Sequence, residues 1–188
     1  MKPRYLRVLF GSFLVALIAT TGWSQVEVEP DQHYLLLATT RTSTMQEELN
    51  EAAALGFRIV VGSPTSADEM VLLLERVATP PDVYRYQLLA TSNTGTMQEE
   101  LDEAASRGFR LLPSTMISKS SMWGSDELVV VLERSPGEVL RYEYRLLATN
   151  RTATLQTEVT QARAEGFDIH GLVSRGEHIV IMGREADR

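Results

Sequence analysis

The sequence predicts an α+β protein built from three tandem β-α-β-β units, and three observations carry this prediction. A stretch of 25 residues recurs three times, at residues 34–58, 86–110 and 144–168. The first and second stretches share 18 identities, the first and third 14, and the second and third 12. Each stretch holds an apolar run and a helical pattern, and further apolar runs follow it. The composition, 44% hydrophobic and 23% charged, is that of a globular protein.

The first 24 residues are typical of a signal peptide. The basic segment MKPRYLR precedes twelve mostly apolar residues, VLFGSFLVALIA, and small residues occur at Gly22 and Ser24. This run is shorter than the roughly 20 residues that cross a bilayer, and an uncleaved span is the alternative interpretation. We expect cleavage after Ser24 and a periplasmic or secreted protein without a transmembrane span after cleavage.

The net charge and the absence of cysteine argue against several classes of function. The chain has 18 basic and 25 acidic residues, and the first 24 residues contain three of the basic ones and none of the acidic ones. The net charge of −7 therefore becomes about −10 after cleavage, which argues against a nucleic-acid partner. Because the chain has no cysteine, it has no disulfide, thiolate metal site or catalytic thiol.

A strand and a helix are expected at the start of each unit. The YxLLAT segment is short, apolar and led by an aromatic residue, which predicts a strand. Thr44 and Thr96 each begin a Thr-x-x-Glu capping box, whereas Thr154 is followed by Thr157 in place of the glutamate. These threonines predict the helix start, and the helix should be about eleven residues long.

The pattern of the first unit also predicts where the helix ends. Met45, Leu49 and Ala52 form one apolar stripe, and Gly56 stands where a left-handed C-cap is expected. The next apolar run begins at Phe57 and predicts the second strand, from which a loop leads into the third.

The units are placed at residues 33–77, 84–135 and 142–185. Turn-forming residues in ATPPDV and SPGEV mark the linkers between them. A unit of this size is marginally stable alone, so we expect the three to share one core.

Several predicted strands are apolar on both faces, as at residues 72–74 and 129–131. Such strands are covered on both sides, and one helix per unit covers only one side. The preferred arrangement is a pseudo-threefold one, with a closed or nearly closed sheet and three helices outside. An open sheet that dimerises is the alternative.

The third unit carries a resemblance to a known family. The strand YEYRLL, the helix end EGFDI and the hairpin that follows resemble a small bacterial β-α-β-β domain family of unknown function. The resemblance recurs in all three units, with phenylalanine where the family has tryptophan after the glycine. It implies the fold of each unit and no activity.

Histidine is the remaining good metal ligand, and the chain has only His33, His170 and His178. A two-residue turn at residues 175–176 would pair Val173 with His178 and place His170 on the opposite face of the sheet. We therefore predict no metal site and no cofactor. No G-x-S-x-G motif occurs, which argues against an esterase-type catalytic triad.

One end of the protein is expected to collect the loops. If the first strand runs up, the loop before the helix and the loop between the second and third strands both lie at the top. Threonine-rich segments and three helix starts meet there, and their hydroxyls and free amides are able to hold an anion or a sugar hydroxyl. Thr42, Thr44, Gln46 and Glu48 are identical in all three units, which a structural role repeated by duplication also explains.

The second unit departs from the others by a longer loop, STMISKSSMWGSD, which contains the only lysine after Lys2. Its large apolar residues are expected to dock against the protein itself or against a partner. The candidate contact residues are Thr42, Thr94, Thr152, Arg41, Arg151, Lys119, Met122 and Trp123.

Together these features predict an exported, non-enzymatic module that binds an unidentified protein or a small polar ligand through its loop-rich end. We expect a monomer or a homodimer. A hydrolase-like enzyme that uses the same end and a purely structural envelope protein are the alternative hypotheses.

Overall fold

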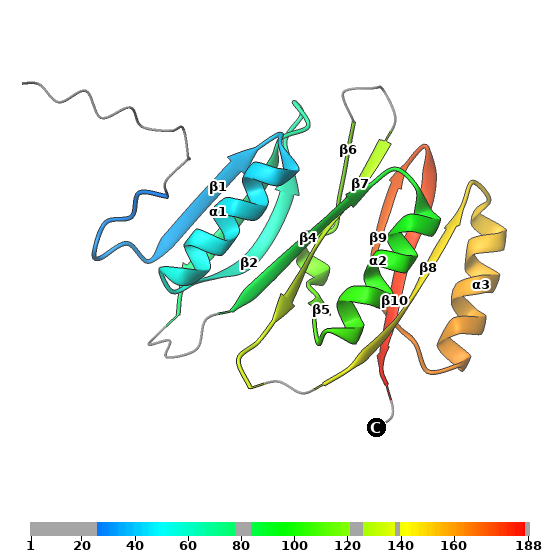
Figure 1. The fold of residues 1–188 in the computed structure, drawn as a ribbon. Helices are drawn as coiled ribbons and strands as arrows, with labels where there is room; N and C mark the ends of the chain where they lie inside the picture. The colour runs from blue at the N-terminus through cyan, green and yellow to red at the C-terminus, as the bar shows by residue number, and fades with distance from the viewer. Residues whose placement is uncertain (1–25, 78–83, 121–125, 138–139, 187–188) are drawn as a thin grey trace, which may run out of the picture.

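The computed structural model describes residues 26–77, 84–120, 126–137 and 140–186, which form three units in a row (Figure 1). The first unit contains β1 (Tyr34–Thr39), α1 (Thr42–Ala54), β2 (Phe57–Pro64) and β3 (Met70–Arg76). The second contains β4 (Arg85–Thr91), α2 (Thr94–Ser106), β5 (Arg110–Leu111), the short 3-10 helix η1 (Pro113–Thr115), β6 (Ile117–Ser120) and β7 (Asp126–Arg134). The third contains β8 (Tyr142–Thr149), α3 (Thr152–Ala164), β9 (Asp168–Arg175) and β10 (Glu177–Glu185). The predicted signal peptide lies outside the described residues.

Each unit forms its own antiparallel sheet with its last strand in the middle. The strand orders are β1-β3-β2, β4-β7-β5 and β8-β10-β9, and β6 also pairs with β7. The α+β class and the repeated β-α-β-β pattern are confirmed. The expected closed or nearly closed sheet is wrong, because the described strands form three separate sheets.

The units join through helix packing, and this explains why the sheets stay separate. α1 packs against β1 and β2 of its own unit and also against β4 of the next unit. α2 packs in the same way against β4 and β8. Each of these helices therefore lies between two sheets, and β1 and α3 lie at opposite ends of the row (Figure 1).

The strand β7 shows how a sheet is covered on both faces. Val129 and Val131 belong to the cluster of buried residues around α1, whereas Leu128, Val130 and Leu132 belong to the cluster around α2. The prediction that strands apolar on both faces are covered on both sides is confirmed for this strand. It is wrong for residues 72–74, where Leu73 is only half-buried and its cross-strand partner Leu36 is 61% exposed. Hydrophobic clusters thus extend across both junctions between units.

The helices begin two residues before the predicted threonine caps. Their N-cap residues are Arg41, Asn93 and Arg151, and of these only Asn93 uses its side chain, which accepts a hydrogen bond from the N–H of Thr96 at 3.0 Å. The last threonine of each first strand explains the early start, because its hydroxyl accepts a hydrogen bond from the N–H of the N-cap residue at 3.1 Å. The capping boxes predicted at Thr44 and Thr96 and the cap predicted at Thr154 are therefore wrong, and each helix has 13 residues instead of the expected eleven.

The predicted helix stripe and C-cap are confirmed. Met45 and Leu49 are fully buried, and the glycine after each helix adopts a left-handed conformation. Gly56, Gly108 and Gly166 have φ angles of 87°, 81° and 91°. No helix within the described ranges has the length and hydrophobicity needed to cross a membrane.

The single side-chain cap gives a testable prediction. Asn93→Ala should lower the free energy of unfolding by about 1 kcal/mol, because the N–H of Thr96 loses its acceptor. Arg151→Ala is the matched control and should have almost no effect, since the Arg151 side chain does not cap its helix. Urea titrations of both variants measure the difference, and equal losses would contradict the assigned cap.

Candidate functional site

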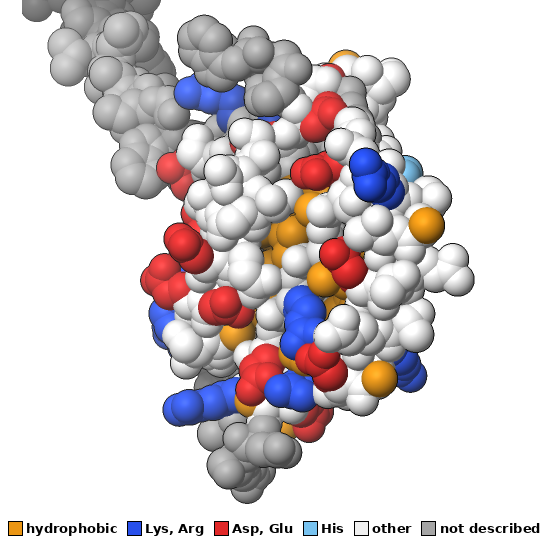
Figure 2. All heavy atoms as spheres, turned by 90° about the vertical axis from the view of Figure 1, so that its right-hand side faces the viewer, with side chains coloured by type: hydrophobic (Ala, Val, Ile, Leu, Met, Phe, Trp, Pro, Cys, Tyr) orange, Lys and Arg blue, Asp and Glu red, His pale blue; other side chains and the backbone are white. Residues whose placement is uncertain are grey.

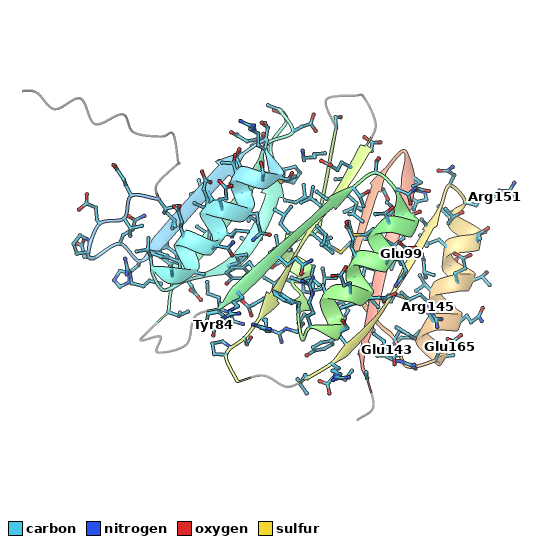
Figure 3. The ribbon with its side chains drawn as sticks, in the orientation of Figure 1. Tyr84, Glu99, Glu143, Arg145, Arg151 and Glu165 are labelled. Atoms are coloured by element: carbon cyan, nitrogen blue, oxygen red, sulfur yellow. The ribbon has the colours of Figure 1, made fainter. Side chains whose placement is uncertain are left out.

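The loop-rich end is where the sequence predicts a binding site. The loops before the helices and the β2–β3 and β9–β10 hairpin loops lie along the upper side of the row in Figure 1, as the chain direction predicts. Thr42, Thr94 and Thr152 are the first residues of the three helices. Arg41 and Arg151 precede two of these helices and are exposed, and Figure 3 shows Arg151 extending away from the end of the row.

Lys119 lies inside the protein at this end. Its side chain forms an ion pair with Glu127 at 2.9 Å and donates a hydrogen bond to the carbonyl oxygen of Thr40 at 3.2 Å. The next residue, Ser120, donates its N–H to Asp68 Oδ1 at 2.8 Å. These contacts fasten β6 of the second unit to two loops of the first. The other two candidates of this loop, Met122 and Trp123, lie outside the described residues.

The cavity between units 2 and 3 at this end is small. Its volume is about 40 Å³, and it lies beside the start of α2 and the hairpin of β9 and β10. A volume of this size holds one or two water molecules. This cavity therefore gives no support to a small polar ligand bound at the loop-rich end.

Histidine and acidic residues form no metal centre in the part of the chain that the structure describes, where no cluster of three or more such residues has the required geometry. His178 pairs with Ser174 across the hairpin, so the predicted pairing with Val173 is wrong by one residue. The two imidazoles nevertheless lie on opposite faces. The His170 ring contacts Tyr144 edge-on at 5.8 Å, whereas His178 lies on the side of α3.

Two glutamine side chains bind across the junctions between neighbouring units. These junctions are the best-defined binding sites in the described part of the chain. The Gln46 side chain donates to the carbonyl oxygen of Tyr86 at 3.1 Å and accepts from the N–H of Leu88 at 2.7 Å. Gln98 makes the same pair of bonds to Tyr144 and Leu146, at 3.0 and 2.7 Å. Each carboxamide therefore binds the edge of the following unit's first strand as a neighbouring strand would.

Tyrosine side chains anchor the same strands. Tyr86 and Tyr144 are 4% and 5% exposed, and each reaches back to the preceding unit. The Tyr86 hydroxyl accepts from the N–H of Ile59 at 3.2 Å, and the Tyr144 hydroxyl accepts from the N–H of Leu111 at 2.7 Å. Burial raises the pKa of Tyr86, so the hydroxyl keeps its proton and is able to donate it to the buried carboxylate of Glu133.

The third helix carries the same glutamine, and no further unit follows it among the described residues. Gln156 is exposed, whereas Gln46 and Gln98 are half-buried. It borders an open groove, which we call the α3 groove, formed by Thr152, Leu155, Gln156, Val159, Thr160, Leu172, Ser174 and His178. Figure 2 views this end of the molecule and shows hydrophobic side chains in a hollow between charged ones.

The third sheet exposes residues beside this groove whose counterparts are buried in the other two units. Ile169 and Leu172 are each 59% exposed on β9. Ile59 and Leu111, which occupy the position of Ile169 in the other units, are 7% and 1% exposed. The difference arises because the next unit covers these two residues.

Ion pairs support the lower end of the groove. Arg145 pairs with Glu165 at 2.6 Å, and Arg184 pairs with Glu143 at the same distance (Figure 3). Both arginines also lie over the ring of Phe167. The hydrogen bond from Arg145 lowers the pKa of Glu165. These contacts hold the last turn of α3 against its sheet.

Comparison with protein-family models, with curated proteins and with solved structures finds no match for this chain. The resemblance drawn from the sequence therefore stays a prediction. The three identical glutamines are visible in the sequence, where they lie beside the predicted helix starts. The sequence signal is a count: the glutamine occurs in all three units, and in the described residues two of the three bind the strand of a following unit.

Junction tyrosines give a second prediction. Tyr86→Phe should lower the free energy of unfolding by about 1–3 kcal/mol, because the N–H of Ile59 loses its partner in the core. Tyr34→Phe is the matched control, since Tyr34 has the same position in unit 1 and is 62% exposed, and it should change stability by less than about 0.5 kcal/mol. Denaturant titration distinguishes the two. Equal effects would show that the hydroxyl contributes nothing at the junction.

His170 gives a prediction of pH dependence. Burial lowers the pKa of this residue below its ordinary value of 6.5, and the nearby positive charge of Arg110 lowers it further. The unfolded chain therefore binds a proton more readily than the folded protein, and stability should decrease as the pH falls below about 6.5. His170→Leu, which introduces the residue found at this position in unit 2, should make that decrease smaller. Urea titrations at pH 7.5 and 5.5 test this, with His178→Gln as the control.

Proposed function

We propose that this protein is an exported, non-enzymatic binding module that captures an extended segment of a protein in the α3 groove. The observation that carries the proposal is the way in which Gln46 and Gln98 bind β4 and β8. Gln156 has the same position on α3 and is exposed. The export part of the proposal rests on the sequence of the first 24 residues.

The junctions define the chemistry of the segment that would fit. A carboxamide has an NH2 group that donates and an oxygen that accepts, which match the carbonyl of one residue and the N–H of the second residue after it on the same edge of an extended chain. Side chains of these two residues point into the junction, where Tyr86 and Leu88 pack. The groove should therefore select an aromatic residue and a leucine two positions apart, in a segment able to form a strand.

The loop-rich end is a second candidate contact surface. The exposed side chains of Arg41 and Arg151 favour it, and they would suit an acidic surface of a partner. The α3 groove has the stronger support, because Gln46 and Gln98 bind a strand at the corresponding positions of the two internal junctions.

A labelled peptide tests the proposed function. The peptide YRYQLLATS has the sequence of residues 84–92 and contains the strand that Gln46 binds. It should bind saturably to the dilute protein in a fluorescence anisotropy titration. Gln156→Ala should weaken binding about tenfold, because it removes two hydrogen bonds to the peptide main chain. Glu99→Ala, which changes an exposed residue of α2, should leave binding unchanged (Figure 3).

A chemical control examines the main-chain contact directly. The same peptide with an N-methyl group on the leucine that corresponds to Leu88 lacks the N–H that the glutamine side chain accepts at the first junction. It should bind the wild-type protein about as weakly as the unmodified peptide binds Gln156→Ala. If neither change affects binding, or if the unmodified peptide does not bind, the groove does not have the proposed role.

A further inference from the structure

We infer that the partner that fills the α3 groove is β1 of a second copy of this chain, so that the protein assembles head to tail. This inference rests on the proposed function and names its partner. The first support comes from the opposite end of the row. Tyr34 and Leu36 of β1 are 62% and 61% exposed, and they occupy the positions of Tyr86 and Leu88.

The outer face of sheet 1 repeats the surface that the two internal junctions bury. Its first strand reads YLLLAT, against YQLLAT in β4 and YRLLAT at the corresponding positions of β8. In unit 2 the corresponding face is completed by Val129 and Val131, which are buried against unit 1. The same positions in β3 are Val71 and Leu73, which are half-buried. Unit 1 therefore exposes an apolar face, and the corresponding faces of units 2 and 3 pack against the preceding unit.

The β1 face at one end fits the α3 groove at the other end, whereas neither surface fits a second copy of itself. A second copy that docked its β1 into the α3 groove would continue the row with the geometry of the internal junctions. Gln156 would bind the main chain at Tyr34 and Leu36, and the Tyr34 hydroxyl would approach the main chain of Ile169. Such a contact joins different surfaces, so it leads to rings or to open filaments rather than to a symmetric dimer.

Docking of β1 into the α3 groove would break one hydrogen bond within the chain. The carbonyl oxygen of Tyr34 accepts a hydrogen bond from the Gln32 side chain at 2.8 Å within the same chain. Gln156 of the neighbouring copy would replace one amide donor by another, so the exchange costs little. The Gln32 contact also indicates that this edge is protected while the chain is alone.

The proposed contact between two copies lacks an ion pair that is present at the junction between units 1 and 2. Arg58 forms an ion pair with the buried carboxylate of Glu133 across that junction at 2.8 Å. The corresponding positions at the contact between two copies are Asp168 and Glu75, which are both acidic. The second junction has Gly183 at the position of Glu133, so the packing does not require this ion pair. Association between copies should therefore be weaker than association within the chain, and reversible.

Sedimentation velocity of the full chain, as recovered from cells, over a series of concentrations tests the inference. We expect the mean mass to rise above that of the monomer as concentration increases. Leu36→Asp at one end and Leu172→Asp at the other should each abolish the rise, and both residues are exposed, so folding is preserved. Leu55→Asp is the matched control, because Leu55 is exposed and lies on neither face.

Mixing the two blocked variants distinguishes a head-to-tail contact from a symmetric one. Leu36→Asp retains an intact α3 groove, and Leu172→Asp retains an intact β1 face. The mixture should therefore form a complex of one copy of each and nothing larger. If the mixture stays monomeric although each variant alone has lost association, the contact is symmetric and the inference is wrong.

The remaining outcomes separate this inference from the proposed function. If the wild-type chain is monomeric at every concentration and the labelled peptide still binds, the groove captures a segment of another protein and the self-assembly is wrong. If the chain associates and Leu36→Asp has no effect, β1 is not the partner. If neither the peptide nor a second copy binds, both proposals fail.

Discussion

The fold depends on covering each helix from two sides. A helix that packs on the sheet of its own unit still has a second apolar flank, and in units 1 and 2 the first strand of the next unit covers it. Met45 and Met97 are completely buried as a result, whereas Leu155 at the same position of α3 stays partly exposed. The separate sheets, the linear order of the units and the two unlike ends all follow from this requirement.

The glutamine side chains supply the hydrogen bonds that an edge strand needs when it packs on a helix. A strand that covers a helix lies at the edge of its sheet, and its outer N–H and carbonyl groups need partners away from water. At the helix start, one carboxamide supplies both a donor and an acceptor to that edge. Gln46 and Gln98 thereby make the junction specific for main-chain geometry, while the apolar side chains around them supply most of the burial.

The sequence predicts the units well because each unit is specified locally. The repeats, the order of strand and helix, the apolar stripe and the glycine C-caps all follow from patterns within about 50 residues of each other. The relation between units does not. Residues 129–131 indicate correctly that both faces of a strand are covered, but the pattern does not say whether a sheet or a helix covers them. The capping box at Thr44 fails for a similar reason, because the hydroxyl of Thr39 begins the helix earlier.

Candidate site residues were harder to predict, and the second unit shows why. A lone lysine in a polar loop suggests an exposed contact, yet Lys119 is 7% exposed and holds two units together. The inserted segment that carries it packs against both neighbours: Thr115 and Ile117 approach Gly62 of unit 1, and Met116 approaches Gly171 of unit 3. A residue's type and its sequence neighbours do not reveal such a distant partner.

The first and last of the described units expose side chains at positions that the internal junctions bury. Repeat arrays usually close with terminal units whose outer faces are polar, because an uncovered junction surface exposes apolar side chains to water. Here both ends keep the junction surface, with Tyr34 and Leu36 at one end and Ile169 and Leu172 at the other. Seven of the 13 helical positions differ between α1 and α3, and Gln156 is among those that do not. The glutamine that binds a strand edge in two units is kept on the third helix beside an apolar groove, and the proposal of a strand from outside the chain rests on this combination.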